Sequence, residues 1–123
     1  MEKEFIPYEQ AVALKELGFD EKCLSCYLYE VETFSWELNY QISNNSIPWI
    51  ISAPLYQQAF RWFRENYSLY GTIRYGNNEL DKSIYLFPCI NGIIVGNDSF
   101  KTQEEAELEC LKKLIKIVNE IEK

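Results

Sequence analysis

Apolar and polar positions recur along the chain with two different periods. Apolar residues at spacings of three and four indicate amphipathic helices over residues 7–17, 53–66 and 102–121. Alternating or continuous apolar runs of three to nine residues indicate β-strands. The expected strands cover residues 23–31, 34–42, 47–51, 69–75, 83–90 and 93–95, with 47–51 a short strand of weaker pattern. The predicted order is therefore α-β-β-(β)-α-β-β-β-α.

Residues with special backbone or capping chemistry set the predicted ends of the helices. Pro7 suits the first turn of the first helix, and Gly18 supplies the left-handed residue that follows a helix, with Phe19 packing back onto it. Ser52 is the expected N-cap of the second helix. Residues 102–105, Thr-Gln-Glu-Glu, form a capping box that begins the third helix.

Turn residues delimit the strands in the same way. Asn91-Gly92 is the strongest hairpin signal, because a type I′ turn needs two residues that tolerate positive φ. Residues 76–78, Gly-Asn-Asn, are expected to open the preceding turn, and residues 43–46, Ser-Asn-Asn-Ser, form another. Pro48 confines its strand to a sheet edge or a bulge.

These elements predict one α+β domain spanning residues 1–123, with antiparallel strands and about three helices packed on one face. The second helix should bury Tyr56, Ala59, Phe60, Phe63 and Tyr67, which share one side at 100° per residue, with Leu55 and Trp62 flanking it. The third helix should bury an aliphatic stripe made of Leu108, Leu111, Leu114, Ile115, Val118 and Ile121.

Composition favours a folded chain, and the lack of membrane and secretion signals favours a cytoplasmic location. Apolar residues make up 47% and aromatic residues 15% of the 123 positions, which argues against disorder. No apolar run approaches the roughly 20 residues that a membrane span requires. The acidic start, MEKEFIPYEQ, does not resemble a secretory signal. We therefore expect a cytoplasmic protein without membrane contacts.

Cysteine and histidine usage narrows the chemistry further. The sequence has no histidine, which removes the usual general base and the usual zinc ligand. Cys23 and Cys26 form the C-x-x-C pair, but no second such pair completes a zinc site, and Cys89 and Cys110 stand alone. Buried reduced thiols are the expected state, with metal or redox use as the weaker alternatives. No phosphate-binding glycine loop or nucleophile elbow occurs, so we expect neither catalysis nor a cofactor.

Charge is unevenly distributed in a chain whose net charge is −7. Residues 1–37 hold nine acids and three lysines, and residues 79–123 hold nine acids and six lysines. Between them, residues 38–78 hold one acid, Glu65, and every arginine of the protein. This arginine-containing window is also rich in aromatic residues. The expected ligand-binding residues are Arg61, Arg64 and Arg74 for an anion, with Gln57 beside them and Trp62, Tyr70 or Tyr75 for stacking.

The same window also fits a simpler interpretation, a buried helix face with a solvated back and no binding site. Most of its aromatic residues fit a buried helix face, and two arginines on the back of a helix are often only solvated. Arg61 and Glu65 would then form a minor i,i+4 ion pair. The position of Trp62 distinguishes the two interpretations, because an exposed indole would favour a stacking site.

Direct nucleic-acid binding is not expected. The order from Ala53 onward, α-β-β-β-α, also describes double-stranded-RNA-binding domains, which meet phosphates with lysines at the start of the last helix. Here that position reads KTQEEAELE, whose four glutamates would repel a phosphate backbone. Mimicry of nucleic acid by the acidic faces is the converse alternative, although the charges are dispersed.

Three stretches carry a resemblance to known proteins: EFIPYEQAVALKELGFDEKC, ISAPLYQQAFRWFRENYSLYG and SFKTQEEAELECLKKLIKI. They resemble a group of small uncharacterised proteins from phages and prophages of Bacteroidota-type bacteria, and they cover about half of the chain. The resemblance implies a setting, a phage accessory protein acting inside a bacterial cell. No site residue follows from it, because the group has no established activity.

Two modes of action fit this setting. The first is sequestration of a small anionic, nucleotide-like host signal in the arginine- and aromatic-rich middle, with a pocket between subunits of a homo-oligomer as one arrangement. The second is inhibition of a host protein, which requires an exposed apolar patch with an acidic or aromatic rim. A structural or accessory phage protein without a ligand is the remaining alternative. The expected function is thus a non-catalytic, counter-defence binding protein.

Overall fold

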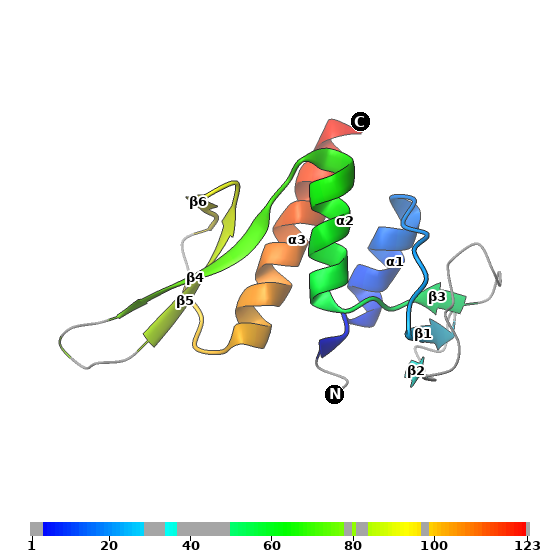
Figure 1. The fold of residues 1–123 in the computed structure, drawn as a ribbon, viewed down its shortest axis with the longest axis horizontal. Coiled ribbons are helices and arrows are strands. Elements are labelled where there is room, and N and C mark those ends of the chain that lie inside the picture. Colours follow the sequence, from blue (N-terminus) through cyan, green and yellow to red (C-terminus); the bar gives the residue numbers. More distant parts are fainter. Residues whose placement is uncertain are drawn as a thin grey trace. The chain divides into compact units, whose positions relative to one another are not determined.

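The computed structural model describes residues 4–28, 34–36, 50–77, 80, 84–96 and 99–122 (Figure 1). Within these residues the chain is an α+β protein, as predicted, and both sheets are antiparallel. Its elements are α1 (Tyr8–Glu16), β1 (Ser25–Leu28), β2 (Phe34–Trp36), β3 (Ile50–Ser52), α2 (Tyr56–Tyr67), β4 (Gly71–Asn77), β5 (Ile84–Ile90), β6 (Ile93–Ile94) and α3 (Gln103–Ile121).

The chain divides into two compact units, residues 1–59 and residues 60–123, and the division falls inside α2. We call them the N-terminal unit and the C-terminal unit. Each contains one three-stranded sheet, so the strands do not join into one sheet. The expectation of a single domain stays a prediction, because one continuous helix belongs to both units.

The N-terminal unit begins with α1, whose C-terminal end has the predicted left-handed cap. Gly18 has φ +97°, and its N–H donates to the carbonyl of Lys15. The N–H of Phe19 donates to the carbonyl of Leu14 at 3.0 Å, and the Phe19 ring is buried. These two bonds are the Schellman pattern, which satisfies carbonyls that the last helical turn leaves unpaired.

The sheet of the N-terminal unit has the order β2-β1-β3. All three residues of β3 are buried, and α1 packs against this strand. Buried polar groups on β1 have partners: the Ser25 hydroxyl donates to the carbonyl of Ala53, and the Tyr27 hydroxyl donates to the carbonyl of Ile6. β3 is at the edge of this sheet, in agreement with the edge position predicted from Pro48.

Two predictions about this unit are wrong or lie outside the described residues. Ser52 does not cap α2, because it is a buried residue of β3 paired with Cys26. The helix starts at Tyr56, and the N–H of Ala59 donates to the carbonyl of Leu55. The distal ends of the first two predicted strands, residues 29–31 and 37–42, the turn at 43–46 and Pro48 lie outside the described residues.

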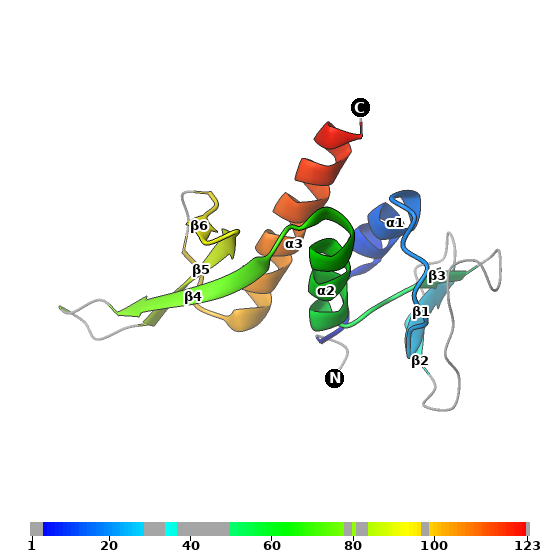
Figure 2. The same ribbon diagram turned by 45° about the horizontal axis from the view of Figure 1, so that its top comes forward.

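The sheet of the C-terminal unit has the order β4-β5-β6. Asn91 and Gly92 have φ of +53° and +81° and join Ile90 to Ile93, so the predicted two-residue hairpin is confirmed. Gly76 and Asn77 do not open a turn, because they pair with Tyr85 and Ile84. The β4–β5 hairpin extends past α3 in both ribbon views (Figure 2).

α3 packs against β4 and β5, so this sheet has one face covered by a helix. Thr102 caps α3: its Oγ1 accepts from the Glu105 N–H at 3.2 Å and its hydroxyl donates to the Glu105 carboxylate. The predicted buried stripe is largely confirmed. Leu108 is only half-buried and Ile121 is exposed, whereas Ala106 and Cys110 are buried.

Candidate functional site: the second helix and the outer sheet face

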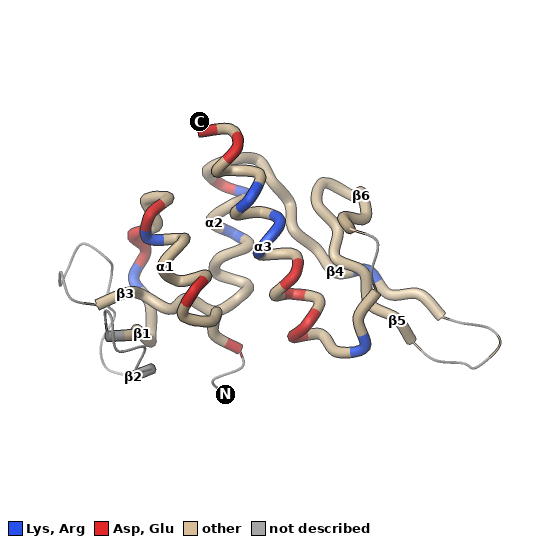
Figure 3. Tube along the Cα trace, turned by 180° about the vertical axis from the view of Figure 1, so that it is seen from behind, with Lys and Arg blue, Asp and Glu red and all other residues tan. Residues whose placement is uncertain are grey.

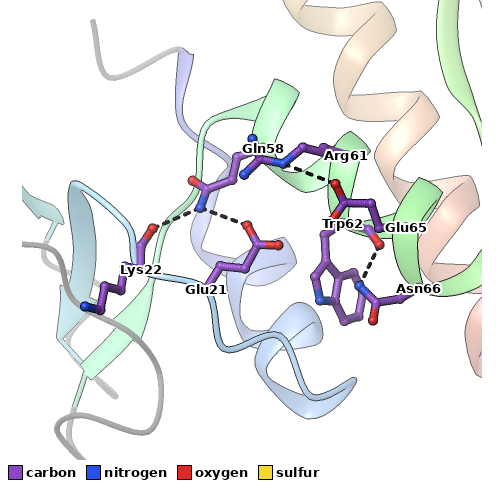
Figure 4. Close-up of polar contacts among 7 residues, drawn as sticks. All are labelled: Glu21, Lys22, Gln58, Arg61, Trp62, Glu65 and Asn66. Atoms are coloured by element: carbon purple, nitrogen blue, oxygen red, sulfur yellow. Dashed lines mark hydrogen bonds and ion pairs between the residues drawn. The ribbon is translucent and has the colours of Figure 1, made fainter.

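The polar stripe predicted on α2 is exposed. Gln57, Arg61 and Arg64 recur at i, i+4 and i+7 and are all exposed to solvent. The Arg61 Nε lies 3.9 Å from a Glu65 carboxylate oxygen, and both side chains are more than half exposed (Figure 4). A pair this long and this exposed contributes little to stability.

Trp62 does not lie in this stripe. Its side chain is 7% exposed, and its ring makes edge contacts with Phe63 and Tyr67 at centroid distances of 5.1 and 5.5 Å. The amide of Asn66 donates to the Trp62 carbonyl at 2.9 Å. The indole therefore belongs to the core of α2, and it offers no open π-face for stacking.

Gln58, next to the stripe, has a structural role that the sequence pattern did not indicate. Its Nε2 donates to a carboxylate oxygen of Glu21 at 3.2 Å and to the carbonyl of Lys22 at 2.9 Å (Figure 4). These bonds attach the start of α2 to the segment after α1 inside the N-terminal unit. The partners are 37 and 36 residues away, so spacing along the sequence could not have found them.

The two faces of the β4-β5-β6 sheet can be assigned from Gly71. A Cβ on Gly71 would lie 3.0 Å from Leu114 and 3.1 Å from Cys110, so the Gly71 side faces α3. Because successive residues of a strand point to opposite faces, Ile73 and Tyr75 share this helix side. Thr72, Arg74 and Gly76 point the other way, onto what we call the outer face.

The predicted site residues of this region divide between the two faces. Arg74 is on the outer face and is exposed. Tyr70 precedes β4, and its main chain is hydrogen-bonded to Asn91. The Asn91 N–H donates to the Tyr70 carbonyl at 3.0 Å, and the Asn91 Oδ1 accepts from the Tyr70 N–H at 2.8 Å. By alternation Tyr70 shares the outer face with Arg74, and its side chain is 52% exposed. Tyr75, 73% exposed, lies on the opposite face.

Cross-strand pairing adds residues that the sequence analysis did not single out. Phe87 is opposite Arg74, Tyr85 is opposite Gly76, and Ile94 is opposite Cys89, which itself pairs with Thr72. Paired residues project on the same side of a sheet. The outer face therefore carries Arg74, half-buried Phe87 and Tyr85, fully buried Cys89 and exposed Ile94. The alternation of each strand was visible in the sequence, but the register that unites them was not.

Charge separates the outer face from the rest of the chain. Arg74 is the only charged residue in the sequences of β4, β5 and β6. Figure 3 shows acidic positions along α1 and α3 and basic positions on α2 and α3, whereas the paired strands are almost uncharged. The three arginines thus form two groups: Arg61 and Arg64 on one helix stripe, and Arg74 alone in an aromatic sheet face.

The cysteines are buried thiols, as predicted. Burial is the main cause that raises the pKa of Cys23 to about 12, with the nearby Glu21 carboxylate adding to it. Burial likewise raises the pKa of Cys110 to about 12 and raises that of Cys26. A thiol whose pKa is raised is a poor nucleophile and a poor metal ligand. Within the described ranges, no group of three or more metal-binding side chains forms.

Comparisons with known proteins add no assignment to this geometry. No protein-family model, no curated protein and no solved structure was found to match the chain. Among the described residues, none of the helices has the length and apolar character that would let it cross a membrane.

Proposed function

We propose that this chain is a non-catalytic binding protein that recognises a host protein through the outer face of the β4-β5-β6 sheet. The observation that carries the proposal is the composition of that face: half-buried Phe87 pairs with Arg74, and exposed Tyr70 and Ile94 lie on the same face. Tyrosine and arginine are the residues most enriched at the centres of protein interfaces, and charged residues are otherwise depleted there.

Several features favour a macromolecular partner over a small stacked ligand. Trp62 is in the core, so the stacking residue expected beside Arg61 and Arg64 is not accessible there. The outer face instead combines Arg74 of β4, half-buried Phe87 of β5 and exposed Ile94 of β6, which are three paired strands. Such a surface presents broad contact area rather than convergent polar groups. A face that carries a single charge, Arg74, fits a largely uncharged protein surface.

The resemblance to phage and prophage proteins supplies the biological setting of the proposal. A phage accessory protein acts within the bacterial cytoplasm on components of its host. A small protein that uses its surface for binding would act there by blocking a host protein, and antagonism of a host defence system is the role we propose for it. The absence of histidine from the sequence supports action by binding rather than by catalysis.

The test compares two sets of surface substitutions on an otherwise intact chain. The protein is immobilised through its C-terminus and exposed to lysate of a Bacteroidota host. The outer-face variants are Arg74→Glu and Ile94→Asp, and the matched control is Arg61→Glu with Arg64→Glu on α2. We expect a host protein that is retained by the wild-type chain and by the control but lost from both outer-face variants.

The captured protein is then purified and titrated against the same variants by calorimetry. We expect each outer-face substitution to weaken the affinity by about 2 kcal/mol, or thirtyfold, because it introduces an unpaired charge into the interface. If every captured protein binds the outer-face variants as well as the wild type, the proposal is wrong.

A second candidate function rests on the α2 stripe. Gln57, Arg61 and Arg64 present two guanidinium groups and an amide on one exposed line, a donor set suited to phosphate or carboxylate. The test is a thermal-shift and calorimetric screen of cyclic and linear nucleotides against the wild type and the Arg61→Ala, Arg64→Ala double variant. Stabilisation of the wild type alone supports this function, and no stabilisation by any nucleotide at millimolar concentration excludes it.

A further inference from the structure

β4 is at the edge of its sheet, and alternate residues direct their main-chain groups away from β5. Opposed residues in an antiparallel pair alternate between pairs that exchange two hydrogen bonds and pairs that exchange none. The Asn91 N–H donates to the Tyr70 carbonyl, which makes Tyr70–Asn91 a bonded pair. By this alternation, the N–H and C=O groups of four residues of β4 point away from β5: Gly71, Ile73, Tyr75 and Asn77.

Two observations on β5 agree with this assignment. Leu86, which pairs with Tyr75, makes two main-chain hydrogen bonds with Phe100. Its N–H donates to the Phe100 carbonyl and its carbonyl accepts from the Phe100 N–H, each at 2.8 Å, so both groups of Leu86 face away from β4. Pro88, opposite Ile73, has no N–H to give to β4. We call the N–H and C=O groups of Ile73, Tyr75 and Asn77 the outer edge. No strand of the described residues pairs with it.

We infer that the outer edge of β4 pairs antiparallel with the same edge of a second copy of this chain, about a two-fold axis at Tyr75. Three residue pairs would then face each other: Ile73 with Asn77, Tyr75 with Tyr75, and Asn77 with Ile73. Each pair exchanges two N–H···O bonds, because every one of these residues directs both groups outward. The partner is defined by this chemistry, since an unpaired strand edge is satisfied most completely by another strand.

The charge of Arg74 selects the register. An axis at Arg74 would put two guanidinium groups directly opposite each other, and like charges so placed are destabilising. An axis at Ile73 would bring the second strand beside Gly71, where a Cβ would already meet Phe60 of α2 at 3.4 Å. An axis at Tyr75 places Arg74 of each copy opposite Gly76 of the other, which has no side chain.

The surroundings of Gly76 complement the cation of the other copy. A Cβ on Gly76 would lie 3.5 Å from a ring carbon of Phe87, so this ring extends beside the glycine. Arg74 of the second copy would therefore meet an aromatic ring rather than a charge, the arrangement that favours a cation–π contact. The strand contains no acid that would compete for Arg74.

Pairing of this kind makes one continuous sheet from the two three-stranded sheets and brings two outer faces onto one surface. The inference goes beyond the proposed function, because it concerns the edge of the sheet and holds whatever the outer face binds. Tyr75, 73% exposed, and Ile84, 56% exposed, lie on the helix side near the distal end of the hairpin. Their apolar surface would become partly covered when the second hairpin adds beside them.

Disulfide crosslinking of two introduced cysteines tests both the pairing and its register. The four native thiols are buried, so a cysteine introduced on β4 is the accessible one. In the Tyr75→Cys variant the two sulfur atoms face each other across the axis, with Cα atoms about 5.5 Å apart, which suits a disulfide. In the exposed control, Thr72→Cys, the two cysteines are six positions out of register, about 20 Å apart.

We expect the wild-type protein to show a concentration-dependent monomer–dimer equilibrium in sedimentation, and mild oxidation to join Tyr75→Cys but not Thr72→Cys. Tyr75→Pro removes one outward N–H from each copy and leaves the β4–β5 bonds intact. It should therefore weaken dimerisation about tenfold or more without changing the circular dichroism of the monomer. A wild-type protein that sediments as a monomer up to millimolar concentration, or equal crosslinking of both cysteine variants, overturns the inference.

Discussion

The two sheets of this protein have the same size and the same antiparallel pairing, yet they differ in what they expose. In the β2-β1-β3 sheet, the described side chains of β1 and β3 are buried, and the polar ones among them have hydrogen-bond partners. In the β4-β5-β6 sheet, only the last three residues of β5 are buried, and both isoleucines of β6 are exposed. The described side chains of β1 and β3 thus belong to the core, whereas many side chains of the β4-β5-β6 sheet are accessible to solvent.

This difference indicates that the exposed apolar residues of the C-terminal unit are not a failure of packing. The same chain buries Ser25 and Tyr27 with their hydroxyl groups paired, which is a demanding form of packing. Ile93 and Ile94, in contrast, are exposed although aliphatic residues are the ones most often buried. Exposed aliphatic side chains are frequent at interaction sites, and Ile94 is the one of these two that lies on the outer face used in the proposed function.

The largest expected effect compares one isoleucine from each sheet. Ile51→Ala in β3 removes a fully buried side chain and should lower the free energy of unfolding by about 2–5 kcal/mol. Ile94→Ala in β6 removes a half-exposed one and should change it by less than about 0.5 kcal/mol. Urea unfolding measures both. Equal losses from the two substitutions would contradict the contrast between the sheets.

A second comparison lies within β4 and uses its two glycines. Gly71→Ala places a methyl group 3.0 Å from Leu114 and 3.1 Å from Cys110, and should lower the unfolding free energy by about 1–3 kcal/mol. Gly76→Ala meets only Phe87 at 3.5 Å, an ordinary contact, and should be neutral or slightly stabilising. Thermal unfolding distinguishes them. A tolerated Gly71→Ala would mean that α3 does not pack closely on the start of β4.

Each unit contains a thiol whose pKa is raised to about 12, Cys23 in the first and Cys110 in the second. Unfolding returns each thiol to its ordinary pKa near 9, so above that pH the unfolded state loses protons that the folded state retains. The contribution of these two thiols to stability should therefore be constant below pH 9 and fall between pH 9 and 12, by about 1 kcal/mol per pH unit for each thiol.

The alkaline loss can be assigned to one unit by substitution. Cys110→Ala should reduce the fall in stability above pH 9 by about 1 kcal/mol per pH unit, and Cys23→Ala should do the same for the other unit. Both are followed by urea midpoints at pH 8 and pH 10. An unchanged slope in the Cys110→Ala variant would show that the thiol is already accessible in the folded protein.

The smallest expected effect compares two tyrosine hydroxyl groups. Tyr27→Phe removes a buried donor to the Ile6 carbonyl and should cost about 0.5–1.5 kcal/mol of unfolding free energy. Tyr75→Phe changes an exposed side chain and should have no measurable effect at concentrations where the chain is monomeric. A stability loss from Tyr75→Phe under those conditions would mean that the outer part of the hairpin is packed rather than exposed.

Local chemistry in the sequence predicted those parts of the fold that short-range interactions determine. Gly18 and Asn91-Gly92 have the positive φ that their residue types favour, and Thr102 caps α3 through a residue three positions away. Ser52 failed as a cap because tertiary pairing with Cys26 placed it in a strand, which local preference does not reveal. The division of the strands into two sheets likewise depends on long-range pairing.

The candidate site was predictable only in part, for the same reason. The helical period correctly predicted Gln57, Arg61 and Arg64 as one exposed stripe. It left Trp62 ambiguous at the border of the buried face, and packing against Phe63 and Tyr67 decided its place. The placement of Arg74, Phe87 and Ile94 on one sheet face depends on the strand register. Register is determined by turn geometry together with the burial of apolar side chains.

The side chain of Asn91 has a consequence for how the protein ages. Asparagine followed by glycine is the sequence most prone to cyclise through its own backbone and lose ammonia, and here the pair lies in an exposed turn. The Asn91 amide oxygen accepts from the Tyr70 N–H at 2.8 Å, so the carboxamide is held by a hydrogen bond. A held carboxamide samples fewer of the conformations that cyclisation needs, so we expect this contact to slow deamidation of the turn, which a mass increase of one dalton in stored samples would report.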